Sequence, residues 1–345
     1  MIPDLACSWL YGEPSAKAVL RTTADDFQVF ERLPFEPDGE GEHLFLYIRK
    51  IGENTDWVAR QLARFCQVSP RDVGYAGKKD RHAVAEQWFS VRVPIGRTFS
   101  WSLFGGDTIE VLKAERHSRK LRLGALSGNR FVIRLRQVTD GAALAARIEQ
   151  VRQGVPNYFG EQRFGREGGN LLKGQALLAG TLKERQRHKK GLYISALRSW
   201  LFNQLISARI DQGLWDSILP GDVLMLNGSQ SCFMAGEEAD LPERLARGDL
   251  HLTGPMWGRG ELMTRDEAQA FEIAALAPWQ TIREGLEGLG LNQERRALRL
   301  LPRDLTADEE AEGQWRLEFE LPAGSFATSV LRELCQWHNA ANEQT

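Results

Sequence analysis

The amino-acid sequence predicts an α+β fold with much antiparallel strand pairing. Three segments, 90–94, 130–137 and 316–321, alternate apolar and polar side chains, as half-buried strands do. Other segments place apolar residues three or four positions apart, as amphipathic helices do. These strands and helices do not follow one another as a regular βα repeat, which argues against a doubly wound parallel sheet.

The helical segments carry recognisable patterns. The first is expected at about 54–65, where apolar residues recur at i, i+4 and i+7 and Asn54 or Thr55 can act as the cap. The second is expected at 194–208, where five apolar residues follow one another in steps of three or four. A capping-box pattern at 264–267 predicts the start of a third helix.

Length and composition limit the class of protein. A chain of 345 residues is too long for one ordinary core, so we expect two domains. Its four cysteines stand alone in the sequence, which fits a reducing cytoplasm and predicts neither disulfides nor a metal site. The N-terminus lacks a signal-peptide pattern, and no apolar run reaches transmembrane length. We therefore expect a cytoplasmic protein that uses no metal and does not bind a membrane.

The charges are unevenly distributed although the net charge is only −2. Segment 113–136 contains eight Lys or Arg and one acid, Glu115, and 183–190 contains five bases and one acid. A local positive stripe would support phosphate contacts, whereas the simpler interpretation is a solvated face. We favour a functional role for the first run, because its bases flank a Gly-Asn turn expected at 128–129, and leave both interpretations open for the second.

The most informative segment is 74–84, Gly-Tyr-Ala-Gly-Lys-Lys-Asp-Arg-His-Ala-Val. Its single carboxylate, Asp80, lies among four groups that are or can become cationic: Lys78, Lys79, Arg81 and His82. Nearby cations favour the ionised form of an acid, which can then act as a nucleophile or accept a proton, and they attract a polyanion. The alternative is a solvated turn built on two glycines.

Segment 74–84 resembles the signature of the TruD family of tRNA pseudouridine synthases. Two departures from the family pattern occur near the N-terminus, where Arg21 replaces the usual lysine and Ala24 the usual proline. Five further segments are similar to family motifs and follow in the family's order: 21–31, 35–43, 120–131, 154–165 and 321–329.

The resemblance implies a domain organisation that the sequence pattern alone does not. The expected fold is a pseudouridine-synthase catalytic core with a mixed, largely antiparallel sheet, interrupted by an inserted α/β domain particular to the family. The expected boundaries are 1–154 for the first part of the catalytic domain, 155–305 for the insertion and 306–345 for the return to the catalytic domain. We see no dimerisation heptad and expect a monomer.

The resemblance also implies a reaction. Pseudouridine formation breaks the N1–C1′ bond of a uridine and rejoins the base through C5, without redox change, phosphate energy or metal. The sequence has no dinucleotide-binding fingerprint or P-loop, so we expect no cofactor. The family assigns the essential carboxylate to Asp80, which either adds to C1′ or takes the proton from C2′, and places Arg21 as its partner in a two-point ion pair. The alternative for Arg21 is an ordinary surface arginine.

Three residues are expected to bind the target uridine, because a base that leaves its stack needs stacking and edge contacts. Phe27 matches the aromatic that packs on the base, Asn129 can read a uracil edge or a ribose hydroxyl, and Phe326 can close the pocket. The alternatives are core positions for the aromatics, which we accept for Phe131, and a plain turn for Asn129. The expected phosphate contacts are Lys78, Lys79, Arg81, Arg119, Lys120, Arg122 and Arg163.

Three functions compete at this point. The first is isomerisation of a tRNA uridine, which the resemblance places at uridine 13 of the D-arm. The second is a nucleoside hydrolase that pairs Asp80 with a second carboxylate such as Glu31 or Glu86. The third is a non-catalytic tRNA chaperone or binding module.

Overall fold

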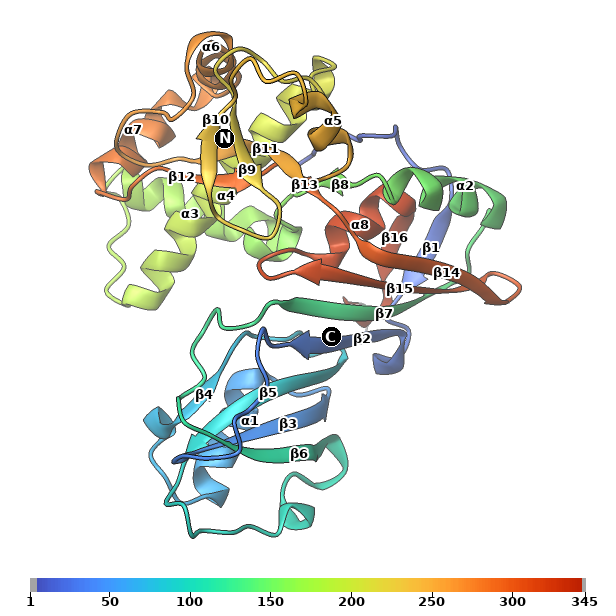
Figure 1. Ribbon diagram of the computed structural model, residues 1–345, viewed down its shortest axis with the longest axis vertical. Helices are drawn as coiled ribbons and strands as arrows, with labels where there is room; N and C mark the ends of the chain where they lie inside the picture. Colours follow the sequence, from blue (N-terminus) through green and yellow to red (C-terminus); the bar gives the residue numbers. More distant parts are fainter. Residues whose placement is uncertain (1–4, 343–345) are drawn as a thin grey trace. The chain divides into compact units, whose positions relative to one another are not determined.

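The computed structural model describes residues 5–342, which form two compact units (Figure 1). Among these, unit 1 contains the residues before Pro14, Gln153–Leu301 and Thr328–Glu333. Unit 2 contains Pro14–Arg152, Pro302–Ala327 and the residues from Leu334 onward. The chain passes from unit 2 to unit 1 between residues 152 and 153, and back to unit 2 between residues 301 and 302. The domain boundaries expected at 154/155 and 305/306 stay a prediction.

Unit 2 is built on one mixed sheet, with ten strands in the described part of the chain. Its continuous strand order is β14-β15-β7-β2-β5-β3-β6; β1 pairs with β7 and β16, and β4 pairs with β5. Only β2 with β5 and β1 with β16 pair in parallel among these strands, so the prediction of an α+β fold with largely antiparallel pairing is confirmed. The strands are β1 (Lys17–Leu20), β2 (Phe27–Arg32), β3 (His43–Ile51), β4 (Val73–Tyr75), β5 (Val84–Arg92), β6 (Ile109–His117), β7 (Gly128–Arg136), β14 (Arg303–Ala311), β15 (Gln314–Pro322) and β16 (Gln336–Asn339).

The predicted strands fall on this sheet with one difference. Segments 130–137 and 316–321 lie almost wholly in β7 and β15, which alternate because each has one more buried face. Segment 90–94 covers only the end of β5, whose first eight residues are all buried. β5 lies between β2 and β3, and a central strand covered on both faces does not alternate.

Helix α1 (Thr55–Phe65) packs its apolar stripe against β3 and β5 (Figure 1). Val58 and Leu62 are fully buried there with Ile48 and Phe89. Asn54 is the N-cap residue but makes no side-chain capping bond, while the Thr55 hydroxyl donates to Gln87 instead. The other helix of this unit, α2 (Gly141–Val151), begins at Asp140, whose carboxylate accepts from the Ala143 N–H.

Unit 1 combines helices with a four-stranded antiparallel sheet of order β10-β9-β11-β12, counted in the described residues. Gly174 of its first helix approaches Leu197 so closely that a Cβ would lie 2.8 Å from the leucine Cγ. Two further strands, β8 and β13, pair with each other. The elements are α3 (Gly169–Leu178), α4 (Arg187–Asp211), α5 (Leu241–Ala246), α6 (Asp266–Ala275), α7 (Gln280–Gly288), β8 (Val155–Pro156), β9 (Val223–Leu226), β10 (Cys232–Met234), β11 (Leu250–Met256), β12 (Glu294–Ala297) and β13 (Arg299–Leu300), with α8 (Ala327–Leu334) shared between the units.

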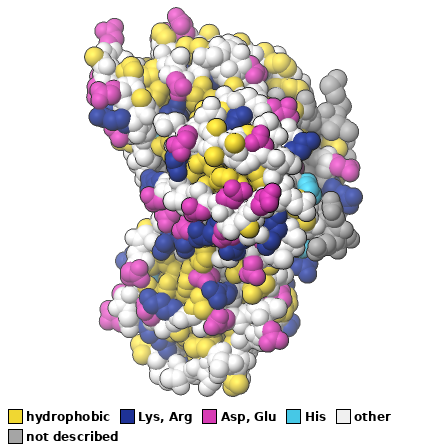
Figure 2. Space-filling view, turned by 90° about the vertical axis from the view of Figure 1, so that its right-hand side faces the viewer, with side chains coloured by type: hydrophobic (Ala, Val, Ile, Leu, Met, Phe, Trp, Pro, Cys, Tyr) yellow, Lys and Arg dark blue, Asp and Glu magenta, His cyan; other side chains and the backbone are white. Residues whose placement is uncertain are grey.

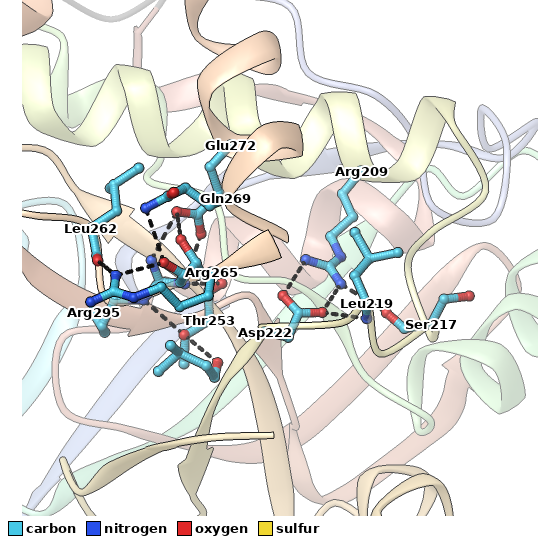
Figure 3. Close-up of polar contacts among 12 residues, drawn as sticks. Arg209, Ser217, Leu219, Asp222, Thr253, Leu262, Arg265, Gln269, Glu272 and Arg295 are labelled. Atoms are coloured by element: carbon cyan, nitrogen blue, oxygen red, sulfur yellow. Dashed lines mark hydrogen bonds and ion pairs between the residues drawn. The ribbon is translucent and has the colours of Figure 1, made fainter. Parts of the chain in front are cut away.

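The predicted helix at 194–208 lies within α4, and the predicted third helix begins within 264–267 as α6, but Thr264 does not cap it. The N-cap of α6 is Arg265, and the Thr264 hydroxyl donates to Glu272 in the core. Glu272 also forms a buried ion pair with Arg295, at 2.8 Å. Figure 3 shows Glu272 and Arg295 of this network.

A second buried ion pair in unit 1 joins Arg209 to Asp222 at 2.6 Å. The Asp222 carboxylate also accepts from the Leu219 N–H, and the Arg209 guanidinium donates to the Ser217 carbonyl (Figure 3). Breaking a buried pair by removing one partner costs about 3–5 kcal/mol, so such pairs fix the core arrangement once formed. Among the described helices, none is both long and apolar enough to cross a membrane.

Candidate active site

Asp80 lies in the irregular loop 76–83 between β4 and β5. Gln87 of β5 donates from Nε2 to the Gly77 carbonyl at 3.0 Å. The Thr55 hydroxyl accepts from the Lys79 backbone N–H at 3.0 Å and donates to Gln87 Oε1 at 2.8 Å. The start of α1 and the middle of β5 thus hold the loop backbone in place.

A buried ion pair anchors the same loop from β2. The Lys79 ammonium lies 2.5 Å from Glu31 Oε2, and both side chains are almost completely buried. Glu31 Oε1 accepts from the Trp88 N–H at 3.0 Å. Burial raises the pKa of Glu31, while the charge of Lys79 acts in the opposite direction. Lys79 therefore does not face solvent, contrary to the expectation that it contacts a phosphate.

Lys50 holds the backbone of Asp80 itself. Its side chain is fully buried, and Nζ donates to the carbonyls of Asp80 at 2.9 Å and of Glu53 at 2.7 Å. Burial lowers the pKa of Lys50 to about 8, against the attraction of the Asp80 carboxylate. Lys50 is not among the predicted site residues, although the sequence carries a signal for it. Lys50 continues the inward-facing series of β3, two positions after Ile48, where an apolar side chain is the norm.

The carboxylate of Asp80 is held by Arg21 through a contact of 2.7 Å between Nη2 and Oδ2. Arg21 is buried, with 5% of the residue exposed, so the surface alternative is wrong. The expected two-point contact is not formed, because Arg21 Nε is buried without a hydrogen-bond partner in residues 5–342. Burial lowers the pKa of Arg21, and the charge of Asp80 opposes that effect.

Arg21 is fixed by more than its ion pair. Its guanidinium lies 4.0 Å from the ring centroid of Phe27, within cation–π range. Its backbone φ is 59°, in the left-handed region that a residue other than glycine seldom adopts. Strained conformations of this kind persist where the surrounding structure enforces them, often at functional sites. The Asp80 side chain remains 40% exposed, so a substrate can reach it.

Phe27 and Asn129 lie on one face of the sheet. β2 and β7 pair antiparallel with Phe27 opposite Ile133 and Glu31 opposite Asn129, and alternate residues share a face. Phe27 is 2% exposed and makes an edge-to-face contact with Phe131, as the core alternative predicts for both rings. In this structure Phe27 supports Arg21 and leaves little of its ring open.

The turn expected at 128–129 is wrong, because both residues open strand β7. Gly128 lies opposite Pro322, and a Cβ at this position would approach the Leu321 carbonyl oxygen to 2.3 Å. Asn129 pairs with Glu31 on one side and Leu321 on the other. Its Oδ1 is buried and has no hydrogen-bond partner among the residues described.

Phe326 is partly buried in the segment between β15 and α8. This segment begins beside Asn129, since the Ala323 N–H donates to the Ser127 carbonyl at 3.1 Å. The turn continues through Gly324, whose φ of 79° favours glycine. The sheet register therefore brings the Phe326 segment and Asn129 to the same end of β7.

The segment carrying Arg119, Lys120 and Arg122 also lies against the Asp80 loop. The Gly124 N–H donates to the Ala76 carbonyl at 2.8 Å, and Lys120 Nζ donates to the Arg71 carbonyl at 2.5 Å. Of the other phosphate candidates in unit 2, Lys78 pairs with Asp56 at 2.7 Å and Arg81 donates to the Gly52 carbonyl, and both are exposed.

Arg163 lies in unit 1 and is largely shielded from solvent. It donates to the Ser195 hydroxyl at 3.3 Å and lies 5.4 Å from the Phe159 ring centroid. Burial lowers the pKa of Arg163.

The basic run 113–136 is not a continuous positive stripe. Arg130, Arg134 and Arg136 each form an ion pair with a carboxylate, on Glu318, Glu310 and Asp26 respectively. On the face of the molecule drawn in Figure 2, Lys and Arg side chains lie interspersed with Asp and Glu. Within this run, only the exposed bases at 119–122 remain as the positive surface that was expected to contact phosphates.

The second carboxylate that a hydrolase needs is not supplied by the two candidates. Glu31 is buried in its pair with Lys79. Glu86 is held by Arg49 at 2.8 Å. Because Glu86 lies opposite Phe30 in the β2–β5 ladder, it faces the other side of the sheet from Glu31.

Comparisons of this chain with known proteins all identify the same family. The family model described as tRNA pseudouridine synthase D (TruD) matches residues 7–188 and 170–334. A tRNA pseudouridine synthase D of Aeromonas salmonicida is 49% identical over 337 residues, which cover 96% of this chain and 95% of that protein. The protein of the same name from Shewanella oneidensis is 47% identical over 338 residues, with coverage of 97% and 90%.

A solved structure from Methanosarcina mazei, assigned to tRNA pseudouridine synthase D, has the same fold. The TM-score is 0.71 at 23% sequence identity, and the match covers 95% of this chain and 94% of that one. The family-model match and the curated relatives extend over nearly the whole sequence. This chain belongs to the tRNA pseudouridine synthase D (TruD) family.

Proposed function

We propose that this protein is a cytoplasmic isomerase that converts a uridine of tRNA, at position 13 of the D-arm, into pseudouridine. The observation that carries the proposal is the Asp80 carboxylate, partly exposed on an anchored loop and held by a buried arginine. The family relationship supplies the reaction, and we propose this geometry as its site.

The reaction breaks the N1–C1′ bond and forms a C5–C1′ bond, while a proton leaves C5 and N1 gains one. Asp80 acts at the ribose, either by adding to C1′ or by taking the proton from C2′. Since Arg21 occupies Oδ2, we propose that Oδ1 is the oxygen that reacts. No step requires a cofactor or a metal ion.

We propose that the remaining site residues bind the extruded uridine. Asn129 Oδ1, which is buried and lacks a partner in the described chain, can accept from the uracil N3–H or a ribose hydroxyl. Phe326 closes the base pocket, and Phe27 holds Arg21 in line with Asp80. Lys78, Arg81 and the bases at 119–122 contact phosphates in unit 2, and Arg163 contacts the RNA from unit 1.

The test is incubation with unmodified tRNA transcripts, followed by chemical mapping of pseudouridine at single-nucleotide resolution. We expect the parent protein to modify position 13. The Asp80→Asn variant should form no product but bind tRNA within about threefold of the parent affinity. Asp25→Asn is the matched control, because Asp25 is an exposed carboxylate outside the proposed site.

Each alternative predicts a different result. Free uracil in the reaction would identify a hydrolase, and full activity of Asp80→Asn would refute the assignment. Unmodified tRNA that nevertheless binds tightly would identify a chaperone. We also expect a monomer, which light scattering checks directly.

A further inference from the structure

Unit 1 contains a pocket of about 640 Å³ that the Asp80 site does not use. It is formed by α6, α7, the loop after β11 and the residue that precedes β12. Its lining includes Trp257, Gln269, Arg283, Glu287 and Gln293. The volume is within the range of ligand sites in proteins.

The sequence of α7 directs a polar face toward this pocket. Ile282 and Leu286, four positions apart, are buried on the core side. Gly285 lies between them, and a Cβ there would approach Leu178 Cδ1 to 2.9 Å, so α7 packs tightly against α3. The residues of α7 that line the pocket are Gln280, Arg283, Glu284 and Glu287.

The polar side chains of one wall of the pocket are already paired. Arg265 donates from Nη1 to the carbonyls of Leu262 and Thr264, at 2.5 Å and 3.0 Å. Gln269 Nε2 donates to the same Thr264 carbonyl at 3.1 Å. Figure 3 shows these side chains at the start of α6.

Two other lining residues each carry a buried polar atom with no hydrogen-bond partner in the described structure. These atoms are Arg283 Nε, a donor, and Gln293 Oε1, an acceptor. Native proteins pair nearly all such atoms, because burial without a partner carries a free-energy penalty. A ligand that offers one acceptor and one donor would satisfy both.

The same pocket offers a flat cationic surface. The Arg283 guanidinium lies 4.9 Å from the ring centroid of Trp257, and the indole N–H donates to Glu287 Oε1 at 2.8 Å, which fixes the ring. Guanidinium planes and aromatic rings both stack on nucleobases. Two arginines and three glutamates line the pocket, so it does not favour a phosphate or another anion.

We infer that this pocket binds an unstacked nucleobase of the RNA, at a second site distinct from the base that is modified. The ligand chemistry is a planar heterocycle that carries both a hydrogen-bond acceptor and a donor, as every RNA base does. A free nucleoside shares this chemistry. The choice of RNA as the source rests on the proposed tRNA function.

The first test compares tRNA binding by Arg283→Met and Gln293→Met with that of the parent protein at several salt concentrations. We expect each variant to bind about 3- to 10-fold more weakly, with an unchanged salt slope and an unchanged kcat at saturating tRNA. Arg247→Met is the control, because Arg247 is an exposed, ion-paired arginine of the same unit outside the pocket. Parental tRNA affinity in both variants would overturn the inference. A slope of log affinity against log salt that is smaller by about 1 would also overturn it, because that change marks a phosphate contact.

The second test uses the parent protein, so it does not depend on how the variants fold. Direct ultraviolet cross-linking to a tRNA transcript is expected to leave nucleotide adducts on peptides from segment 257–293; their absence counts against the site. The indole N–H resonance of Trp257, identified by its loss in Trp257→Phe, is expected to shift when tRNA is added.

Adenosine, cytidine, guanosine and uridine, added singly, separate the two sources of the base. A shift with a nucleoside but not with tRNA would overturn the assignment to RNA, and no shift with either would overturn the site. If the parent protein fails to bind tRNA, the proposed function fails, and the nucleoside titration still decides whether the pocket accepts a base.

Discussion

Replacement of Lys50 by methionine tests whether the buried amine positions the Asp80 loop. The change keeps the length of the side chain but removes the two hydrogen bonds from Nζ to the carbonyls of Glu53 and Asp80. Each carbonyl left without a donor costs about 1–3 kcal/mol. The change also relieves the burial that lowers the Lys50 pKa from 10.5 to about 8, a difference of about 3 kcal/mol. The opposing effects leave a net loss of unfolding free energy at pH 7 of at most about 3 kcal/mol.

The contribution of Lys50 depends on pH with a definite sign. Between pH 8 and 10.5 the unfolded chain holds the Lys50 proton more tightly than the folded protein does, so the parent gains stability as pH rises. The neutral amine still has two hydrogens for the two carbonyls. We therefore expect the stability difference between the parent and Lys50→Met to grow by about 1 kcal/mol from pH 7 to pH 9, measured by urea unfolding.

Activity provides the second readout. A misplacement of about 1 Å in a reacting group can cost about 100-fold, so we expect kcat on a tRNA transcript to fall by about 10- to 100-fold. The tRNA affinity should stay within about threefold, because Lys50 is buried and cannot contact RNA. Lys17→Met is the control, since Lys17 is an exposed lysine of β1. A folded Lys50→Met protein with parental kcat, or with a stability difference that is independent of pH, would refute this reasoning.

Substitutions at three further positions, Glu31, Gly128 and Arg21, test other contacts of the sheet unit. Glu31→Gln leaves the ammonium of its partner buried without a counter-charge, and we expect a loss of about 3–5 kcal/mol in urea unfolding; a loss below about 1 kcal/mol would mean that the pair is not buried in solution. Gly128→Ala forces a Cβ against the neighbouring strand, and we expect a loss of about 1–3 kcal/mol, whereas Gly96→Ala, which has open space around it, should be nearly neutral. Arg21→Lys keeps the cation and should retain kcat within about tenfold, whereas Arg21→Met removes a charge-assisted bond and should lower kcat by about 10- to 100-fold; equal activity of the two variants would exclude a role for the ion pair.

The sequence predicted those elements whose environment is asymmetric. β7 and β15 alternate because one face is more deeply buried than the other, and α1 shows a helical stripe because only one side meets the sheet. β5 has no such asymmetry, since neighbours and packing cover both of its faces, and its pattern was visible only near its end. The capping box at Thr264 failed because the core of unit 1 uses that hydroxyl to bind Glu272.

The prediction of the site depends on family motifs. The resemblance predicted that Asp80, Arg21 and Asn129 act together; the structure pairs Arg21 with Asp80 and places Asn129 opposite Glu31, and their roles stay a prediction. The basic stripe was misjudged, because neutralisation of Arg130 by Glu318 requires the register of β15 against β7, which no local pattern reveals. The inward-facing position of Lys50 in β3 marks it as unusual, but its role was missed because its acceptors are backbone carbonyls, which no residue type in the sequence identifies.

The charges around loop 76–83 give the best physical reason for regarding it as functional. Lys50, Arg21 and the Lys79–Glu31 pair are all buried within reach of this one irregular segment, and burying charge is costly unless partners compensate for it. An apolar core would stabilise the sheet without the free-energy penalty of buried charge, but it would leave a glycine-containing loop free to move. The observed arrangement instead fixes the backbone on both sides of Asp80 and leaves its carboxylate partly exposed. Buried charges that destabilise the fold but fix the position of one exposed side chain are expected where that side chain must meet a substrate in a defined geometry.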